Sequence, residues 1–209
     1  MTDHARQALE HLRDPSQFQW YVIPLLLLVL YVYAVEVQRR DWSTVLAGLA
    51  LWGMDWFNEI WNALVLHATG RAPVWGAAGA SAYRILVGLN IEICLMFAIM
   101  GVVAVKLLPS DPALRIAGIP NRWLLAGLNS ALAVGVELFL HSAGVLTWDW
   151  AWWRAGCPLL IWLVGYLPFF LVCFRVHDLP RLRTKAVTVG ALFALDAAAL
   201  AVFGSLGWL

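Results

Sequence analysis

The sequence has few charged residues and few cysteines. Asp, Glu, Lys and Arg make up 13% of its 209 residues, whereas about a quarter is usual in a soluble domain. No basic block is present, which argues against a nucleic-acid partner. The three cysteines are scattered through apolar segments, so a disulfide framework is not expected. Apolar residues are abundant instead: 62% of the chain is hydrophobic, and these residues fall in long runs.

The apolar runs predict an all-α protein, a polytopic integral membrane helical bundle. A helix needs about 20 residues to cross a bilayer. The chain therefore forms a single transmembrane domain, residues 1–209, with about six transmembrane helices and a short N-terminal surface helix. The expected spans lie near residues 20–37, 44–67, 83–105, 122–145, 157–176 and 186–207. The first residues carry no cleavable signal, so we expect them to stay attached.

Lysine and arginine are unevenly distributed over the loops. Nine of the 14 basic residues lie in or beside the loops near residues 38–43, 106–121 and 177–185, and five lie in or beside the other loops and the termini. Basic loops stay on the cytoplasmic side of a membrane. We therefore expect these three loops to be cytoplasmic and both termini to lie outside, in a bacterial inner membrane.

The sequence is rich in tryptophan, with 13 residues. Indoles favour the headgroup zone of a bilayer. We therefore expect the tryptophans of one loop to anchor the outer interface rather than bind substrate, namely Trp148, Trp150, Trp152 and Trp153. Other tryptophans, among them Trp52 and Trp56, lie within the expected spans, where an interfacial belt does not account for them.

Apart from Glu36 at the end of the first span, five carboxylic acids lie inside the expected spans. Asp55 and Glu59, four residues apart, share one face of the second span with Asn62. The others are Glu92 in the third span, Glu137 in the fourth with His141 one turn later, and Asp196 in the sixth. A charged group at the centre of a membrane helix costs about 2.5–3.5 kcal/mol even on the lenient insertion scale. Each of these acids therefore suggests a function.

The depths of these acids predict where they meet. At 1.5 Å per residue, Glu59, Glu92 and Glu137 lie about 10–13 Å from the outer surface, and Asp196 lies near the midplane. Acids from three or four helices are thus expected to converge in one cavity in the outer half of the membrane. No Lys or Arg lies deep in a span to neutralise them. Because burial and mutual repulsion disfavour the charged form, we expect some of these carboxyl groups to be protonated.

Neutral buried acids beside aromatic side chains suit carbocation chemistry. A protonated carboxyl can protonate an alkene or an epoxide, and indole faces stabilise the cation where water is excluded. The candidate catalytic acids are Glu59, Asp55, Glu92, Glu137 and Asp196, and the candidate pocket residues are Trp52, Trp56, Asn62, Asn90 and His141. The expected partners are a lipophilic, isoprenoid-like small molecule and membrane lipid. No cofactor and no nucleic acid is expected.

One segment resembles a known family. Asp55-Trp56-Phe57-Asn58-Glu59-Ile60-Trp61-Asn62 is similar to the acid-bearing second helix of the small polytopic membrane terpene cyclases, and Asp196 sits in the last helix, as their second acid does. Sterol isomerases of the emopamil-binding type resemble the chain more distantly. The likeness covers two helices, and the cyclases are described with seven spans rather than six. It implies protonation-initiated cyclisation or isomerisation, with Glu59 as proton donor and Asp196 as its partner.

Other functions fit the same acids. A proton-coupled transporter or channel also places acids in the membrane, although no inverted repeat is visible and a chain this short would need to form a homo-oligomer. In a structural subunit, the acids would join helices by hydrogen bonds. For a metal-dependent oxidoreductase the candidate ligands are Glu59, Glu92, Glu137 and His141. If the protein bound a haem, His67 and His141 would be its ligands.

Overall fold

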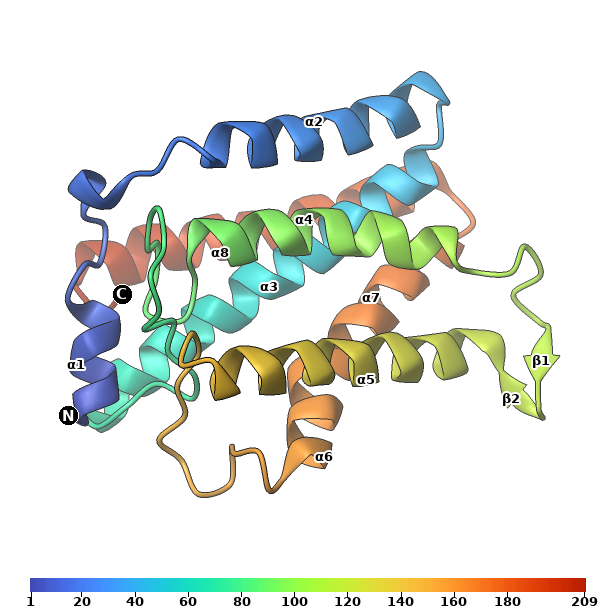
Figure 1. The fold of residues 1–209 in the computed structure, drawn as a ribbon. Helices are drawn as coiled ribbons and strands as arrows, with labels where there is room; N and C mark the ends of the chain where they lie inside the picture. The colour runs from blue at the N-terminus through green and yellow to red at the C-terminus, as the bar shows by residue number, and fades with distance from the viewer.

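The computed structural model describes residues 1–209 and consists mainly of six long helical segments (Figure 1). They are α2 (Val22–Gln38), α3 (Trp42–Thr69), α4 (Ile91–Lys106), α5 (Asn121–Ser142), the segment containing α6 (Pro158–Leu160), η2 (Ile161–Tyr166) and α7 (Leu167–Asp178), and α8 (Leu182–Ser205). A short helix, α1 (Asp3–Leu9), and a 3₁₀ turn, η1 (Pro15–Gln17), precede them, and a small hairpin of β1 (Arg115–Ile116) and β2 (Ile119–Pro120) links α4 to α5. The expected all-α bundle with a short N-terminal helix is confirmed.

The helices differ in how apolar they are along their length. Three segments are long and apolar enough to cross a membrane, Asn121–Ser142, Pro158–Asp178 and Leu182–Ser205, and α2 is a shorter apolar helix. Helix α3 is longer, with 28 residues, but it carries Asp55, Glu59 and Asn62. All three of these polar side chains are buried inside the bundle, so α3 does not present them to lipid.

The third helix begins later than the hydropathy of the sequence indicates. We expected a span near residues 83–105, whereas α4 starts at Ile91 and residues 83–90 form a loop. Asn90 caps the helix, because its side chain accepts a hydrogen bond from the backbone N–H of Ile93 at 2.8 Å. The apolar residues Leu86 and Leu89 of the loop are buried against protein. Their hydrophobicity reflects a protein core rather than contact with lipid.

The fifth helical segment is irregular in its middle. Residues Ile161–Tyr166 form a π-helical turn directly before Pro168. Proline lacks the N–H that an α-helix needs, so it disturbs the helical hydrogen-bond pattern of this segment. The disturbance takes the form of the π turn, a feature that is frequent at functional sites.

The loops lie at two opposite ends of the bundle, and both chain termini lie at the same one of these ends (Figure 1). We call one of them the cap: residues 1–19, 70–90 and 143–157, together with the C-terminus. Thr2 Oγ1 donates to Asp149 at 2.7 Å, and Trp208 stacks on His67 with ring centroids 4.7 Å apart. Arg84 is buried and donates to three backbone carbonyls, those of Gln7, Ala8 and Gly79 at 3.0–3.2 Å. The cap is thus tied together across distant parts of the sequence.

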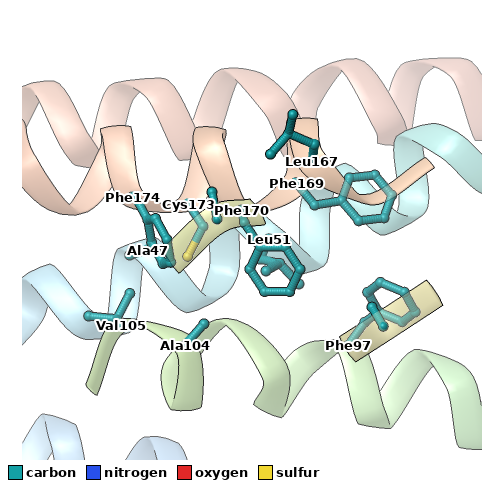
Figure 2. Close-up of a cluster of buried hydrophobic side chains, with 12 residues drawn as sticks. Ala47, Leu51, Phe97, Ala104, Val105, Leu167, Phe169, Phe170, Cys173 and Phe174 are labelled. Carbon is teal, nitrogen blue, oxygen red and sulfur yellow. The ribbon is translucent and has the colours of Figure 1, made fainter. Parts of the chain in front are cut away.

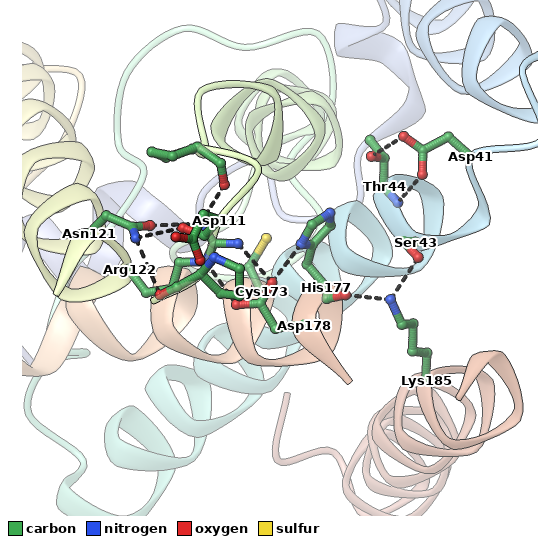
Figure 3. Close-up of polar contacts among 12 residues, drawn as sticks. Asp41, Ser43, Thr44, Asp111, Asn121, Arg122, Cys173, His177, Asp178 and Lys185 are labelled. Carbon is green, nitrogen blue, oxygen red and sulfur yellow. Dashed lines mark hydrogen bonds and ion pairs between the residues drawn. The ribbon is translucent and has the colours of Figure 1, made fainter. Parts of the chain in front are cut away.

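The opposite end, which we call the basic end, holds the loops of residues 39–41, 107–120 and 179–181. Figure 3 shows its polar contacts. Arg122 donates two hydrogen bonds to Asp178, at 2.8 and 3.0 Å, which join α5 to α7. Lys185 donates to Ser43 at 2.6 Å and so joins α8 to α3. The loops that join the six helical segments therefore alternate between the cap and the basic end.

The bundle near the basic end is filled mainly by apolar side chains from α3, α4 and α7 (Figure 2), with two alanines of α5. Leu51, Phe170 and Phe174 are fully buried there. Helices α3 and α4 approach closely, because a Cβ atom on Gly101 would lie 2.8 Å from the Cα atom of Gly48. This packing leaves the polar residues of α3 nearer to the cap.

Candidate functional site

Two carboxyl groups of α3 point into the bundle. Asp55 and Glu59 are 2% and 4% exposed, and Asn62 is fully buried one turn further along the helix. Their spacing of four and three residues places them on one face, as the sequence predicted. That face carries the site because it turns toward the cap loops and α5.

The carboxyl group of Glu59 is held on one side only. The indole Nε1–H of Trp75 donates to Glu59 Oε1 at 2.8 Å, while Glu59 Oε2 is buried without a hydrogen-bond partner. Gly88 lies against this arrangement: a Cβ atom there would come within 2.5 Å of Glu59 Oε2 and 2.6 Å of Trp75 Nε1. Only glycine fits at position 88 without displacing these groups.

Asn62 positions the loop that carries Trp75. Its Oδ1 accepts from the backbone N–H groups of Val74 and Trp75 at 2.7 and 3.2 Å, and its Nδ2 donates to the carbonyl of Trp75 at 2.7 Å. We predicted Asn62 to be a pocket residue, but it does not line the cavity. It fixes the backbone of Trp75, and Trp75 in turn holds Glu59.

A second acid reaches the same place from α5. Glu137 is 5% exposed, and its Oε1 accepts from Trp148 Nε1 at 3.2 Å. The ring of Trp148 stacks on His141 with centroids 3.9 Å apart, and His141 Nδ1 lies 3.0 Å from the carbonyl oxygen of Leu146. His141 therefore supports Trp148, and Trp148 holds Glu137.

These acids face a common cavity of about 170 Å³. Asp55, Glu59 and Glu137 line it. Its aromatic lining consists of Trp75, Trp153, Tyr166, Phe97, Phe169 and Phe170. No Lys, Arg or His belongs to the lining. Besides Glu59 Oε2, the Oδ2 atom of Asp55 and the indole N–H of Trp153 are buried without a hydrogen-bond partner.

Glu92 does not belong to this cavity. Its carboxyl accepts hydrogen bonds from Tyr21 Oη, from Ser81 Oγ at 2.7 Å and from the backbone N–H of Ala82 at 2.8 Å. The predicted depth was wrong because it assumed a helix from residue 83. With α4 starting at Ile91, Glu92 lies in the first turn and ties the cap to α2 and α4.

Asp196 also lies apart from the cavity. It is 3% exposed on α8, and both of its carboxylate oxygens lack a hydrogen-bond partner. Helix α8 packs closely on α3, because a Cβ atom on Gly53 would meet Leu192 at 2.7 Å. Asp196 does not line the cavity with Glu59. Acids from three or four helices were expected to meet in the cavity, but only those of α3 and α5 line it.

The remaining predicted pocket residues take structural positions. Trp52 donates to Cys94 Sγ at 3.3 Å and meets Phe193 edge-on, which places it between α3, α4 and α8. Trp56 packs against the cluster around Ile60, and Asn90 caps α4. None of these three residues lines the cavity.

The prediction that the tryptophans of residues 148–153 anchor the outer interface was wrong in part. Trp153 is 2% exposed and lines the cavity, and Trp148 is buried against Glu137, so these two indoles are not interfacial anchors. Trp152, in contrast, is exposed. Sequence analysis also missed Trp75, Gly88 and Tyr166. The only sequence feature that could have pointed to Tyr166 was Pro168, because the π turn that precedes this proline ends at Tyr166.

The proposed metal ligands do not come together. No group of three or more His, Cys, Asp or Glu side chains has the arrangement of a metal site. Of the four candidates, Glu92 and His141 are engaged elsewhere, in the cap and against Trp148. His67, the proposed haem ligand, stacks on Trp208.

Comparison with known proteins places the chain in a family. A family model described as an uncharacterized membrane protein family matches residues 2–205. The chain belongs to this family. An uncharacterized protein of Archaeoglobus fulgidus is 56% identical over 205 residues, covering 98% of this chain and 97% of the relative. A second uncharacterized protein of that organism is 51% identical over 53 residues, 25% of this chain and 95% of the relative. No solved structure matches.

Membership of the family makes the chain a membrane protein, as composition predicted. These relatives carry no link to terpene cyclases or sterol isomerases, so that resemblance rests on the quoted residues alone. Both relatives are archaeal, and family membership therefore does not restrict the membrane to a bacterial inner membrane.

Proposed function

We propose that the protein is an intramembrane enzyme that protonates a lipophilic substrate, with Glu59 as the proton donor. One observation carries the proposal: Glu59 has one oxygen held by Trp75 and the other without a partner, in a mostly apolar and aromatic cavity that no Lys, Arg or His side chain lines. In such surroundings the neutral carboxyl is favoured over the carboxylate. A neutral carboxyl has a proton to give.

The reaction is a general-acid step followed by loss of a proton. The π electrons of a substrate double bond take the proton from the Glu59 carboxyl, a C–H bond forms, and Glu59 becomes a carboxylate. The faces of Trp153 and Tyr166 stabilise the resulting carbocation. Glu137 or Asp55, also neutral, passes its proton to the Glu59 carboxylate, and the carboxylate so formed takes a proton from a neighbouring carbon while the double bond re-forms in a new position. Both acids are then neutral again, which completes the cycle.

The finer form of the proposal is cyclisation or isomerisation of an isoprenoid, as the resemblance of residues 55–62 to membrane terpene cyclases implies. In cyclisation, a second double bond of the substrate attacks the cation before the proton leaves. Glu59 keeps the role that the resemblance assigns to it. Asp55 and Glu137 take the place of Asp196, because they share the cavity with Glu59.

Proton transport is supported less well. A proton path needs polar groups or water from one side of the membrane to the other. Between the cavity and the basic end, the bundle is packed with apolar side chains such as Leu51, Phe170 and Phe174. For orientation, we propose that the basic end is cytoplasmic, which puts the cavity in the outer half of the membrane.

Deuterium uptake tests the proposal and does not require the substrate to be identified first. The purified protein, in nanodiscs made from the membrane lipid extract of its own host, is incubated in D₂O, and the lipids are analysed by mass spectrometry. We expect carbon-bound deuterium in a lipid with wild-type protein and none with Glu59→Gln. Glutamine keeps the shape and the bond to Trp75 but donates no acidic proton.

Asp196→Asn is the matched control, since it also neutralises a buried acid but lies outside the cavity. It should retain deuterium uptake. Absence of uptake with wild-type protein, full uptake with Glu59→Gln, or complete loss with a folded Asp196→Asn protein would each contradict the proposal.

A further inference from the structure

The cavity is covered at the end of the bundle nearest to it. Trp75, Gly88, Leu146 and Trp153, all residues of the cap, form part of its lining. The cap is anchored by buried Arg84 and by the hydrogen bonds that join its loops. A molecule arriving from the water phase at this end therefore meets packed loops rather than an entrance.

The side of the bundle differs from both ends. Between α4 and α5, most of the lining is apolar: Met96 and Met100 on α4, and Leu132, Val136 and Leu140 on α5, with the amide of Asn129 beside them. Several of them are also exposed on the outer surface, Met96 by 38%, Val136 by 42% and Leu132 by 69%. Helices α4 and α5 are not packed against each other as α3 and α4 are. The cavity thus opens sideways, at a surface that faces hydrocarbon in a membrane.

The chemistry of the lining selects what enters. Three acids and no Lys, Arg or His line the cavity, so a phosphate or carboxylate headgroup would be buried there without a counter-ion, at a large desolvation cost. A hydrocarbon segment, in contrast, meets walls that are mostly apolar and aromatic. The cavity volume of about 170 Å³ is close to that of an apolar cavity of about 150 Å³ that binds benzene. A short segment therefore fills it, and the rest of a lipid extends outward.

We propose that the cavity admits, sideways from the bilayer between α4 and α5, the uncharged hydrocarbon end of a lipid longer than the cavity, while the polar headgroup stays outside. That this lipid is the substrate rests on the proposed function; the route and the binding mode rest on the geometry. The proposal makes the tail, rather than the head, the part of the lipid that reaches Glu59.

Photolabelling tests the binding mode directly. The probes are two forms of hexadecan-1-ol, one with a diazirine at the tail end and one with a diazirine beside the hydroxyl group. Each is incorporated into nanodiscs with the wild-type protein, and the labelled peptides are mapped by mass spectrometry. We expect the tail-end probe to label peptides containing Met96, Trp153 and Tyr166. The hydroxyl-end probe should label residues near the membrane surface instead.

An obstruction of the opening gives a second measurement. Val136→Trp should reduce cavity labelling by the tail-end probe about tenfold, because the indole fills the space between the helices. Leu27→Trp, on the exposed face of α2, is the control and should leave cavity labelling unchanged. Unlabelled hexadecan-1-ol in excess should compete with the probe.

Three results would overturn the inference: equal cavity labelling by both probes, labelling spread evenly over α2 and α8 with none in the cavity, or undiminished labelling of a folded Val136→Trp protein. The wild-type comparison of the two probes needs no variant and decides the question if Val136→Trp fails to fold. In the Glu59→Gln protein, tail-end labelling should persist while deuterium uptake is lost, and this difference separates the binding mode from the proposed function. Tail-end labelling without deuterium uptake by wild-type protein would sustain the binding mode and reject the enzyme.

Discussion

The indole N–H of Trp75 donates a 2.8 Å hydrogen bond to Oε1 of Glu59. This bond joins a loop of the cap to the middle of α3, and it fixes the direction of the one carboxyl that the proposed function depends on. Asn62 holds the backbone of Trp75 from the same face of α3. Two side chains of one helix, three residues apart, are thus connected through a loop that returns to them.

Removal of the Trp75 donor should weaken both the site and the fold. Trp75→Phe keeps an aromatic ring but leaves Oε1 of Glu59 unpaired, at a cost of about 1–3 kcal/mol in the free energy of unfolding. Deuterium uptake should fall about tenfold because Glu59 loses its fixed orientation. Trp150→Phe is the matched control: Trp150 donates to the Pro73 carbonyl at 2.8 Å, in the same cap, without touching an acid. Equal loss of activity in both variants would show that the cap, not the bond to Glu59, matters.

Substitution of Gly88 should disrupt the site by overpacking. In Gly88→Ala the new methyl group meets Glu59, Trp75 and Asn62, and we expect a destabilisation of about 1–3 kcal/mol together with loss of deuterium uptake. Gly135→Ala provides the comparison, since nothing lies within 4 Å of a Cβ atom there. That helical change should stabilise the protein by about 0.5–1 kcal/mol. Thermal unfolding in nanodiscs measures both, and a Gly88→Ala protein of wild-type stability would refute the close packing at Glu59.

A lipophilic amine should bind more tightly than its hydrocarbon counterpart. N,N-dimethyldodecylamine, protonated, carries positive charge where the proposed carbocation forms, and transition-state mimics bind better than substrates. Against 2-methyltetradecane of the same shape, we expect an affinity gain of about tenfold from the aromatic faces and a carboxylate. Displacement of the tail-end photoprobe measures it. The gain should disappear in the double variant Glu59→Gln and Glu137→Gln; if it persists there, the acids do not recognise the cation.

Asp41, the N-terminal capping residue of α3 at the basic end, should make the free energy of unfolding depend on pH. Asp41 accepts hydrogen bonds from the backbone N–H and the side-chain Oγ1–H of Thr44, at 3.1 and 2.6 Å. Partial burial raises the pKa of Asp41, but the bonds from Thr44 and the nearby positive charges outweigh it, so the pKa lies below its ordinary value.

Because the folded-state pKa is lowered, this contribution to stability is present above about pH 4, the pKa in the unfolded chain, and is lost as the pH falls through the folded-state pKa. Asp41→Ala should therefore lower the free energy of unfolding by about 1 kcal/mol at pH 7. The difference from wild type should shrink in strongly acidic solution. Unfolding titrations at both pH values check this, and a difference independent of pH would contradict the role of the charge.

The sequence by itself determined the helices and one face of the site. Long apolar runs are a local signal, so the membrane class, the order of the six helices and the alternation of loops between two ends follow from it. The positions of Asp55, Glu59 and Asn62 on one face of α3 follow as well, because side chains four or three residues apart always share a helix face.

Only the tertiary structure decided which groups meet Glu59. Trp75, Gly88 and Trp153 come from loops whose path depends on contacts between distant residues, which no local pattern encodes. Glu92 and Asp196 were assigned to the site from their depth in the membrane alone, but depth does not say which side of the bundle a residue faces. The start of α4 placed Glu92 in the cap, and the packing of α8 on α3 placed Asp196 outside the cavity. Glu137 reached Glu59 because α5 and α3 turn their polar faces toward the same space, a choice made by packing the whole bundle.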